Sequence, residues 1–270
     1  MGKENISNKK IVLTGASSGI GLEVLKLLAA PELGNTILAV SRHAEEKLNG
    51  FGQNVIPFNA DIGSKEEIDR IFEKGEELFG KIDIFYNNAG FPYLERYNYL
   101  DWKRMEYIFD VNTLGPVYMY TKYINHLNGR PGYLCYTVSC IGIMCLPGYA
   151  LYTATKFGLR GFQQAIRHEQ PDNLKITCLY PVGTDTNFWN AASDGVEIER
   201  AWPVMKAKTI ARKMVRGMQS YRKQIYPLCW EVVYPMMVIC PPARDIFWKL
   251  ERDKFLRNEV KMNAVKAKKN

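Results

Sequence analysis

The sequence has few of the features that bind metals or cross membranes. It contains three histidines and six cysteines, and no two cysteines have the Cys-x-x-Cys spacing typical of zinc sites. The longest uncharged stretch near the end, residues 232–243, has 12 residues and three prolines, too few and too interrupted to span a bilayer. Residues 1–10 are polar and lack the apolar core of a secretory signal. We therefore expect no metal, free thiols and a cytoplasmic location.

Charge is unevenly distributed along the chain. The formal net charge is +8, and residues 244–270 contribute nine Lys/Arg against four Asp/Glu. A basic end without a zinc-finger or RNP-like motif is more often a solvated segment than a nucleic-acid site, so we expect no nucleic acid partner. Hydrophobic residues make up 47% of the sequence, which is typical of a folded globular chain.

Short apolar runs alternate with longer amphipathic stretches. The expected strands are residues 10–13, 36–40, 55–58, 82–86, 133–138, 175–180 and 224–226. The expected helices are residues 19–30, 64–79, 101–127, 152–170 and 209–219. This alternation predicts an α/β fold with a doubly wound parallel sheet, as one domain over residues 1–227 with a C-terminal extension, 228–270. Residues 187–203 are irregular and would suit a substrate lid.

A glycine-rich segment, Thr14-Gly15-Ala16-Ser17-Ser18-Gly19-Ile20-Gly21, lies between the first strand and the first helix. Glycines there permit a tight turn, a close approach to a pyrophosphate and tight packing of helix on strand. The helix N-terminus then offers free N–H groups to an anion. The segment predicts a dinucleotide site with six binding residues: Gly15, Ser17, Ser18, Gly19, Ile20 and Gly21.

The end of the second strand bears on the choice of cofactor. It reads Val40-Ser41-Arg42-His43, without the acidic residue that would accept a hydrogen bond from a ribose 2′-hydroxyl. Arg42 could bind a 2′-phosphate instead, which favours NADP(H) over NAD(H). A solvent-facing arginine would give the same sequence.

A Tyr-x-x-x-Lys motif begins the fourth expected helix. Tyr152 and Lys156 are four residues apart, so a helix places both side chains on one face. Ser139 stands at the end of the fifth strand, and Asn112 lies in an earlier helical region. Combined with the glycine segment, the motif indicates an active site.

Over about residues 8–227 the sequence resembles the classical short-chain dehydrogenases/reductases. The resemblance rests on the glycine segment, Asp61, Asn87-Asn88-Ala89-Gly90, Asn112, Ser139, Tyr152, Lys156 and the segment at Pro181. It implies a Rossmann fold, a nicotinamide cofactor and hydride transfer between a hydroxyl and a carbonyl. It also implies a homo-oligomer, for which a dimer through helices 103–127 and 152–170 is our expectation.

The resemblance also implies roles for single residues. Tyr152 would donate a proton to the carbonyl oxygen, Lys156 would stabilise the phenolate and hold the ribose, and Ser139 would orient the substrate. Asn112 would hold a water that links Lys156 to solvent. Further cofactor contacts are implied for Asp61, Ile62, Asn88, Ala89, Gly90, Tyr152, Lys156, Pro181, Thr184 and Thr186. As alternatives, Asn112 is a plain helix residue and Asp61 only a helix-entry acid.

One segment departs from the family pattern. The usual Pro-Gly followed by Val and Thr reads Pro181-Val182-Gly183-Thr184-Asp185-Thr186 here. Val182 takes the usual glycine position, and Thr184 takes the usual valine position. The departure leaves the nicotinamide end of the site the least defined.

The extension is apolar over residues 228–240 and then basic. Residues 243–260 have the spacing of an amphipathic helix, with the pattern carried by Ile246, Phe247, Leu250, Lys254, Leu256 and Arg257. Three alternatives stay open: the helix packs on the domain, covers a pocket for a lipophilic substrate, or contacts an anionic membrane surface. We predict an NADP(H)-dependent oxidoreductase for a lipophilic or aromatic small molecule; the alternative is a non-catalytic NADP(H)-binding sensor or scaffold.

Overall fold

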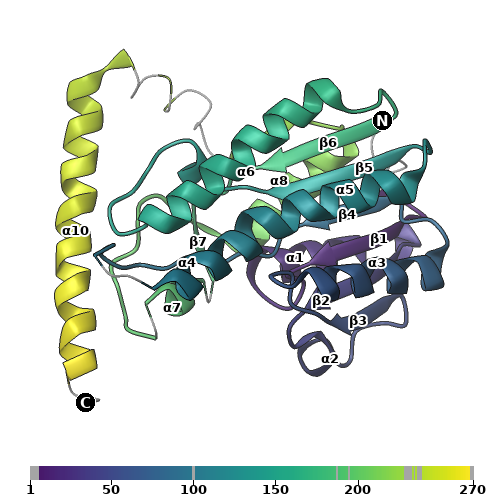
Figure 1. The fold of residues 1–270 in the computed structure, drawn as a ribbon, viewed down its shortest axis with the longest axis horizontal. Coiled ribbons are helices and arrows are strands. Elements are labelled where there is room, and N and C mark those ends of the chain that lie inside the picture. The colour runs from purple at the N-terminus through teal and green to yellow at the C-terminus, as the bar shows by residue number, and fades with distance from the viewer. Residues whose placement is uncertain are drawn as a thin grey trace.

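A computed structural model describes residues 6–98, 101–186, 188–193, 195–227, 233, 235 and 239–267. Its centre is a sheet of seven parallel strands in the order β3-β2-β1-β4-β5-β6-β9 (Figure 1). The strands are β1 Lys10–Thr14, β2 Thr36–Ser41, β3 Val55–Asn59, β4 Ile84–Asn87, β5 Gly132–Thr137, β6 Leu174–Leu179 and β9 Gln224–Ile225. The predicted α/β doubly wound fold is confirmed, and each expected strand lies within two residues of its observed bounds.

Helices cover both faces of this sheet. They are α1 Gly19–Leu28, α2 Ala44–Lys47, α3 Lys65–Phe79, α4 Trp102–Phe109, α5 Gly115–Leu127, α6 Ala150–Glu169 and α8 Ala207–Gln219. Alternate strand residues face opposite layers: Val12 packs into the core shared with α3, α5 and α6, whereas Ile11 and Leu13 pack into the core shared with α1 and α8. Ser64, the first residue of the expected helix 64–79, caps α3, since its hydroxyl accepts a hydrogen bond from the Glu67 N–H at 3.3 Å.

The strand order reverses direction between β1 and β4. The chain moves from β1 outward to β2 and β3, then returns to the other side of β1 with β4. In such sheets a crevice opens at the carboxyl ends of the strands on either side of the reversal. The glycine segment after β1 and the segment after β4 therefore meet at one place, where a ligand can bind.

Short elements lie within and on both sides of residues 187–203, the segment that was expected to be irregular. A two-stranded parallel sheet pairs β7, Gly183–Asp185, with β8, Val204–Lys206, and a short helix α7 spans Phe188–Ala192. These elements lie at the carboxyl edge of the large sheet (Figure 1).

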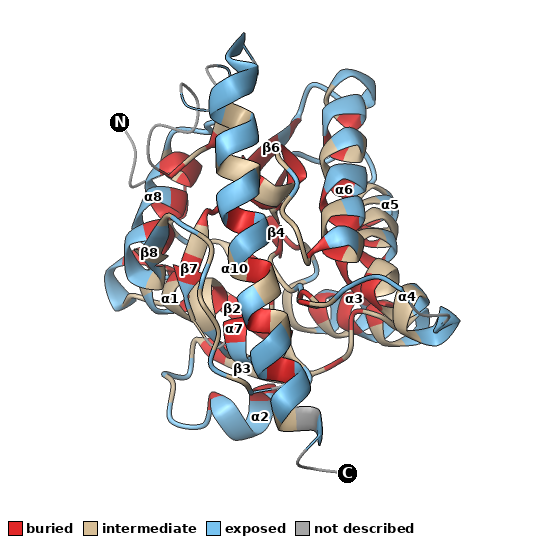
Figure 2. Ribbon diagram, turned by 90° about the vertical axis from the view of Figure 1, so that its left-hand side faces the viewer, coloured by how far each residue is buried: buried red, intermediate tan, exposed pale blue. Residues whose placement is uncertain are grey.

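Within the described part of the C-terminal extension, Pro241–Ala267 forms a long helix, α10, alongside the body of the domain (Figure 1). The predicted helix was shorter, and two of its four apolar residues do not face the domain. Ile246 and Leu250 are 62% and 58% exposed, whereas the face on the domain buries the four residues Glu251, Phe255, Asn258 and Met262 (Figure 2). Within the described residues, no helix is both long enough and apolar enough to span a bilayer.

Candidate active site

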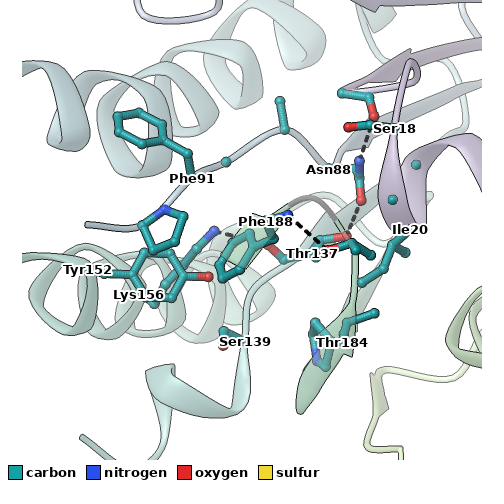
Figure 3. Close-up of a pocket in the computed structure, with 18 of the residues that line it drawn as sticks. Ser18, Ile20, Asn88, Phe91, Thr137, Ser139, Tyr152, Lys156, Thr184 and Phe188 are labelled. Carbon is teal, nitrogen blue, oxygen red and sulfur yellow. Dashed lines mark hydrogen bonds between the residues drawn. The ribbon is translucent and has the colours of Figure 1, made fainter. Parts of the chain in front are cut away.

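A cavity of about 430 Å³ opens at the carboxyl edge of the sheet. The glycine segment lines one end, and Ser139, Tyr152 and Lys156 line the other (Figure 3). Every residue that was predicted to bind the cofactor lines this cavity, although the strands and loops that carry them are far apart in sequence. Asn112 does not line it and lies buried behind the wall.

The glycines of the first loop are required by its geometry. Gly15 and Gly19 have φ angles of +66° and +56°, which residues with a side chain rarely adopt. A Cβ on Gly21 would lie 2.1 Å from the carbonyl oxygen of Gly15, and one on Gly15 would lie 2.8 Å from the Cα of Ala89. The loop therefore packs tightly against both α1 and the segment after β4.

The first turn of α1 has the character of an anion site. Ser18 is the N-cap residue, and its side chain makes no capping hydrogen bond. The N–H groups of a first helical turn have no partner within the helix, and here that turn lines the cavity. The amide of Asn88 fixes the loop by donating to the carbonyl oxygens of Thr14 and Gly15, at 3.1 and 3.3 Å. A dinucleotide pyrophosphate fits this end of the cavity.

Basic residues gather at the outer end of the cavity. Arg42 lines it as predicted, and so do His43 and Lys47, which follow β2 and were not predicted. Only the proximity of Lys47 to Arg42 in the sequence could have pointed to it. A group with two negative charges, such as a 2′-phosphate, would find favourable charges here.

Asp61 joins this end to the helical layer. Its carboxylate accepts hydrogen bonds from the Gly63 N–H at 2.9 Å and from the Tyr107 hydroxyl at 2.8 Å. Burial and the neighbouring Asp61 carboxylate raise the pKa of Tyr107 to about 12. Arg42 Nη1 in turn donates to the Tyr107 hydroxyl at 3.4 Å. Asp61 is thus fixed in orientation at the cavity wall, beyond a role in entering α3.

Tyr152 and Lys156 lie on the buried face of α6. They are only 4% and 2% exposed. Burial raises the pKa of Tyr152 above its ordinary range, and a hydrogen bond from Ser139 opposes that rise. Burial lowers the pKa of Lys156 to about 7. The Lys156 ammonium group donates to the Thr137 carbonyl oxygen at 3.3 Å, at the end of β5.

Asn112 occupies a π-helical turn, Asp110–Leu114, between α4 and α5. Its amide donates to the Phe91 carbonyl at 2.8 Å and to the Thr155 hydroxyl at 3.3 Å, and its oxygen accepts from the Phe91 N–H at 3.0 Å. A Cβ on Gly90 would lie 2.9 Å from the Asn112 oxygen and 3.2 Å from Lys156 Nζ. Asn112 is therefore more than a plain helix residue, since it holds the segment after β4 against α6 beside Lys156.

Thr184 and Thr186, in the segment that follows β6, both line the cavity. The Thr184 carbonyl already accepts a hydrogen bond from Trp189 Nε1 at 2.6 Å, and its hydroxyl donates to the Val182 carbonyl at 2.9 Å. The carbonyl and the hydroxyl of Thr184 are thus already bonded within the protein, although Thr184 lines the cavity. Thr186 is closer to the loop after β1: a Cβ on Gly19 would lie 3.2 Å from Thr186 Cγ2.

The wall beyond Tyr152 is apolar and aromatic. The Phe188 ring lies edge-on to the Tyr152 ring, with ring centres 5.7 Å apart (Figure 3). The sequence indicated a lid at residues 187–203 and, as one alternative, a pocket cover formed by the extension. It did not identify the full set of wall residues, because they come from separate segments without a motif: Phe91, Ile141, Met144, Phe188, Trp202 and Phe247. The charged groups among the described lining residues follow β2 or β3, apart from Lys156. A neutral apolar ligand therefore suits this end.

Comparison with known proteins agrees with this geometry. The family model for short chain dehydrogenase matches residues 9–197. The uncharacterized oxidoreductase YxnA of Bacillus subtilis is 33% identical over 199 residues, which cover 68% of this chain and 54% of that protein's length.

Solved structures share the fold. A short chain dehydrogenase from Burkholderia cenocepacia in complex with NADP has a TM-score of 0.73 at 21% identity, over 88% of this chain and 96% of that one. A short chain dehydrogenase/reductase from Burkholderia phymatum in complex with NAD has a TM-score of 0.72 at 17% identity, over 90% and 95%. Sequence, fold and cavity agree, and the chain belongs to the short-chain dehydrogenase/reductase family of oxidoreductases.

Proposed function

We propose that this oxidoreductase uses NADP(H) to interconvert a hydroxyl and a carbonyl group on a lipophilic or aromatic small molecule. The observation that carries the proposal is the buried Tyr152–Lys156 pair beside Ser139, at the far end of a cavity that begins at a glycine loop. A phenol beside an ammonium group serves proton transfer to a carbonyl oxygen, and a protein that only binds a dinucleotide has no need of it.

The reduction divides between cofactor and protein. NADPH, when bound, supplies the hydride that reaches the carbonyl carbon. Tyr152 gives its phenolic proton to the carbonyl oxygen, and Lys156 stabilises the phenolate that remains. Ser139 donates a hydrogen bond to the same oxygen and so orients the substrate. Asn112 is a positioning residue, because it acts through the segment at Gly90 and through α6.

The chain's own residues would hold the cofactor along the cavity. Residues of the first loop, Gly15 and Ser17 to Gly21, would bind the pyrophosphate. Asp61, Ile62 and the Asn88–Gly90 segment would border the adenosine, and Lys156 would bind the nicotinamide ribose. Pro181, Thr184 and Thr186 would border the nicotinamide. Arg42, supported by Lys47, would bind the 2′-phosphate and give the preference for NADP(H).

Exposed apolar residues support two further parts of the proposal, the pairing of subunits and, as an alternative, a membrane contact. Leu114 and Phe157 are 55% and 41% exposed on the helical layer expected to pair two subunits, which supports a homodimer. A cytoplasmic location is part of the same proposal. Ile246 and Leu250 are exposed on α10, in the basic segment 244–270. Contact of this helix with an anionic membrane surface therefore stays an alternative to its packing on the domain.

A turnover assay tests the proposal. Purified protein is mixed with NADPH or NADH and a panel of neutral aldehydes and ketones, and the loss of reduced cofactor is followed by absorbance. We expect carbonyl-dependent oxidation of NADPH, faster than that of NADH. Tight NADPH binding without turnover of any carbonyl would favour the alternative, a sensor or scaffold that binds the dinucleotide.

A further inference from the structure

The C-terminal helix α10 is packed onto the loops around the substrate end of the cavity. The Phe255 side chain is 8% exposed and belongs to the same apolar cluster as Leu94 and Tyr152. Gly148 makes this packing possible: it has a φ of +83°, and a Cβ there would lie 2.4 Å from Phe255 Cδ2. The helix is thus in contact with the loop that leads into the Tyr152 helix.

Hydrogen bonds from α10 reach the loop after β5 and the segment before β8. Trp248 Nε1 donates to the Cys145 carbonyl at 3.2 Å. Asn258, 2% exposed, accepts from the Glu199 N–H at 2.8 Å and donates to the Glu199 carbonyl at 2.9 Å. A buried amide with both groups bonded to one backbone position specifies a unique docking geometry.

An ion pair also connects α10 to the loop after β4. Arg96 binds the Glu259 carboxylate with two hydrogen bonds, at 2.7 and 2.8 Å. The loops after β4 and β5 and the segment before β8 all contribute side chains to the cavity wall, among them Phe91, Met144 and Trp202. One helix therefore contacts all three wall segments.

The helix also contributes a side chain of its own to that wall. Phe247 is half-buried and lines the cavity, whereas its neighbour Ile246 is 62% exposed. The difference follows from the helical rotation of about 100° between successive residues. The two positions thus form a natural pair, one directed at the cavity and one away from it.

Resting on the proposed function, we infer that Phe247 is a specificity-determining residue, and that α10 supplies the outer wall for the part of the substrate remote from its carbonyl. The ring offers a flat apolar surface, and the neighbouring described wall residues are aromatic or aliphatic. This wall suits neutral carbonyl compounds with an aromatic or extended alkyl group. A short carbonyl compound would reach Tyr152 without touching it.

The test compares Phe247→Ala with Ile246→Ala in the full chain. Each variant is assayed with NADPH and two ketones, butanone and 4-phenylbutan-2-one, which share the reacting group and differ in the attached ring. For Phe247→Ala, kcat/KM should fall about tenfold or more for the phenyl ketone and less than twofold for butanone, because only the former loses apolar contact. Phe247→Leu should recover part of the loss, and Ile246→Ala should match the wild type with both ketones.

A binding measurement keeps the inference testable if turnover is not seen. The neutral aromatic probe N-phenyl-1-naphthylamine is titrated into each protein, and its fluorescence enhancement gives the affinity. Phe247→Ala should weaken probe binding about tenfold, with the melting temperature and the NADPH affinity retained, whereas Ile246→Ala should not. Equal probe affinities in the two variants would overturn the inference, even in a protein that reduces carbonyl compounds. A wild type that binds the probe but reduces no carbonyl would contradict only the proposed function.

Discussion

Lys156 Nζ lies 5.7 Å from the centre of the Tyr152 ring, one turn along the buried face of α6. The two pKa shifts are opposite: burial raises the pKa of Tyr152 and lowers that of Lys156 to about 7. Each shift favours the neutral form of its residue, so the site is costly to charge before ligands bind. This arrangement has a consequence for stability as well as for catalysis.

Replacing Lys156 by Met should stabilise the protein while abolishing turnover. The pKa of Lys156 falls from 10.5 to about 7 on folding. At about 1.4 kcal/mol per pKa unit, this shift disfavours the buried ammonium group by about 5 kcal/mol. We expect the melting temperature at pH 7, without cofactor, to rise by at least about 3 °C in calorimetry.

The pH dependence of the melting temperature is the control for the Lys156→Met prediction. Between pH 7 and 10.5 the unfolded chain binds the Lys156 proton and the folded protein does not, so stability rises with pH over this range. The wild type should therefore approach the Lys156→Met variant in melting temperature between pH 7 and 9. A constant difference between the two proteins over that range would show that Lys156 is not desolvated as described.

Arg42→Ala should reduce discrimination between the two nicotinamide cofactors. Loss of a charge-assisted bond to the 2′-phosphate should raise KM for NADPH about tenfold or more and leave KM for NADH nearly unchanged. Arg70→Ala is the control, because Arg70 lies close by, ion-pairs with Glu67 and does not line the cavity. The measurement is KM for NADPH and for NADH in steady-state kinetics of the wild type and both variants. A tenfold preference of the wild type for NADH would show that Arg42 does not select NADPH.

Phe157→Glu should convert a dimer into monomers. Phe157 is 41% exposed on α6, and a charge there would be buried without a partner if two subunits pair through this layer. Leu250→Glu on α10, also an exposed apolar position, should leave the dimer intact. Light scattering at micromolar concentration measures both masses. If the wild type is monomeric, or if only Leu250→Glu dissociates it, the expected interface is wrong.

The sheet and the side chains of the candidate site could be predicted from the sequence because their signals are local. The glycine spacing, the Ser64 cap and the Tyr152–Lys156 pair each depend on a few adjacent residues. The face of α10 could not be predicted in this way. Ile246 and Leu250 have the spacing of a buried stripe but stay exposed. The domain instead binds Asn258 through the backbone of Glu199. It also accommodates the Phe255 ring beside Gly148.

The apolar wall of the cavity could be predicted only in part, for a related reason: the sequence indicated the segment 187–203 and the extension, but not which residues line the cavity. Phe91, Phe188 and Phe247 belong to separate segments, and only the folded chain brings them to one cavity. The basic end of the cofactor site was only half predicted, because Lys47 reaches it through the short helix α2, which carries no apolar periodicity in the sequence.

The most direct test of the account is a comparison of Tyr152→Phe with Tyr149→Phe in carbonyl-dependent oxidation of NADPH. Tyr149 is buried beside Tyr152 in the same aromatic cluster, with ring centres 6.5 Å apart, but it does not line the cavity. Loss of the Tyr152 hydroxyl should lower kcat at least ~100-fold with NADPH affinity retained, since it removes the proton donor alone. Tyr149→Phe should stay within a few-fold of the wild type. Turnover by Tyr152→Phe within a few-fold of the wild type would contradict the account.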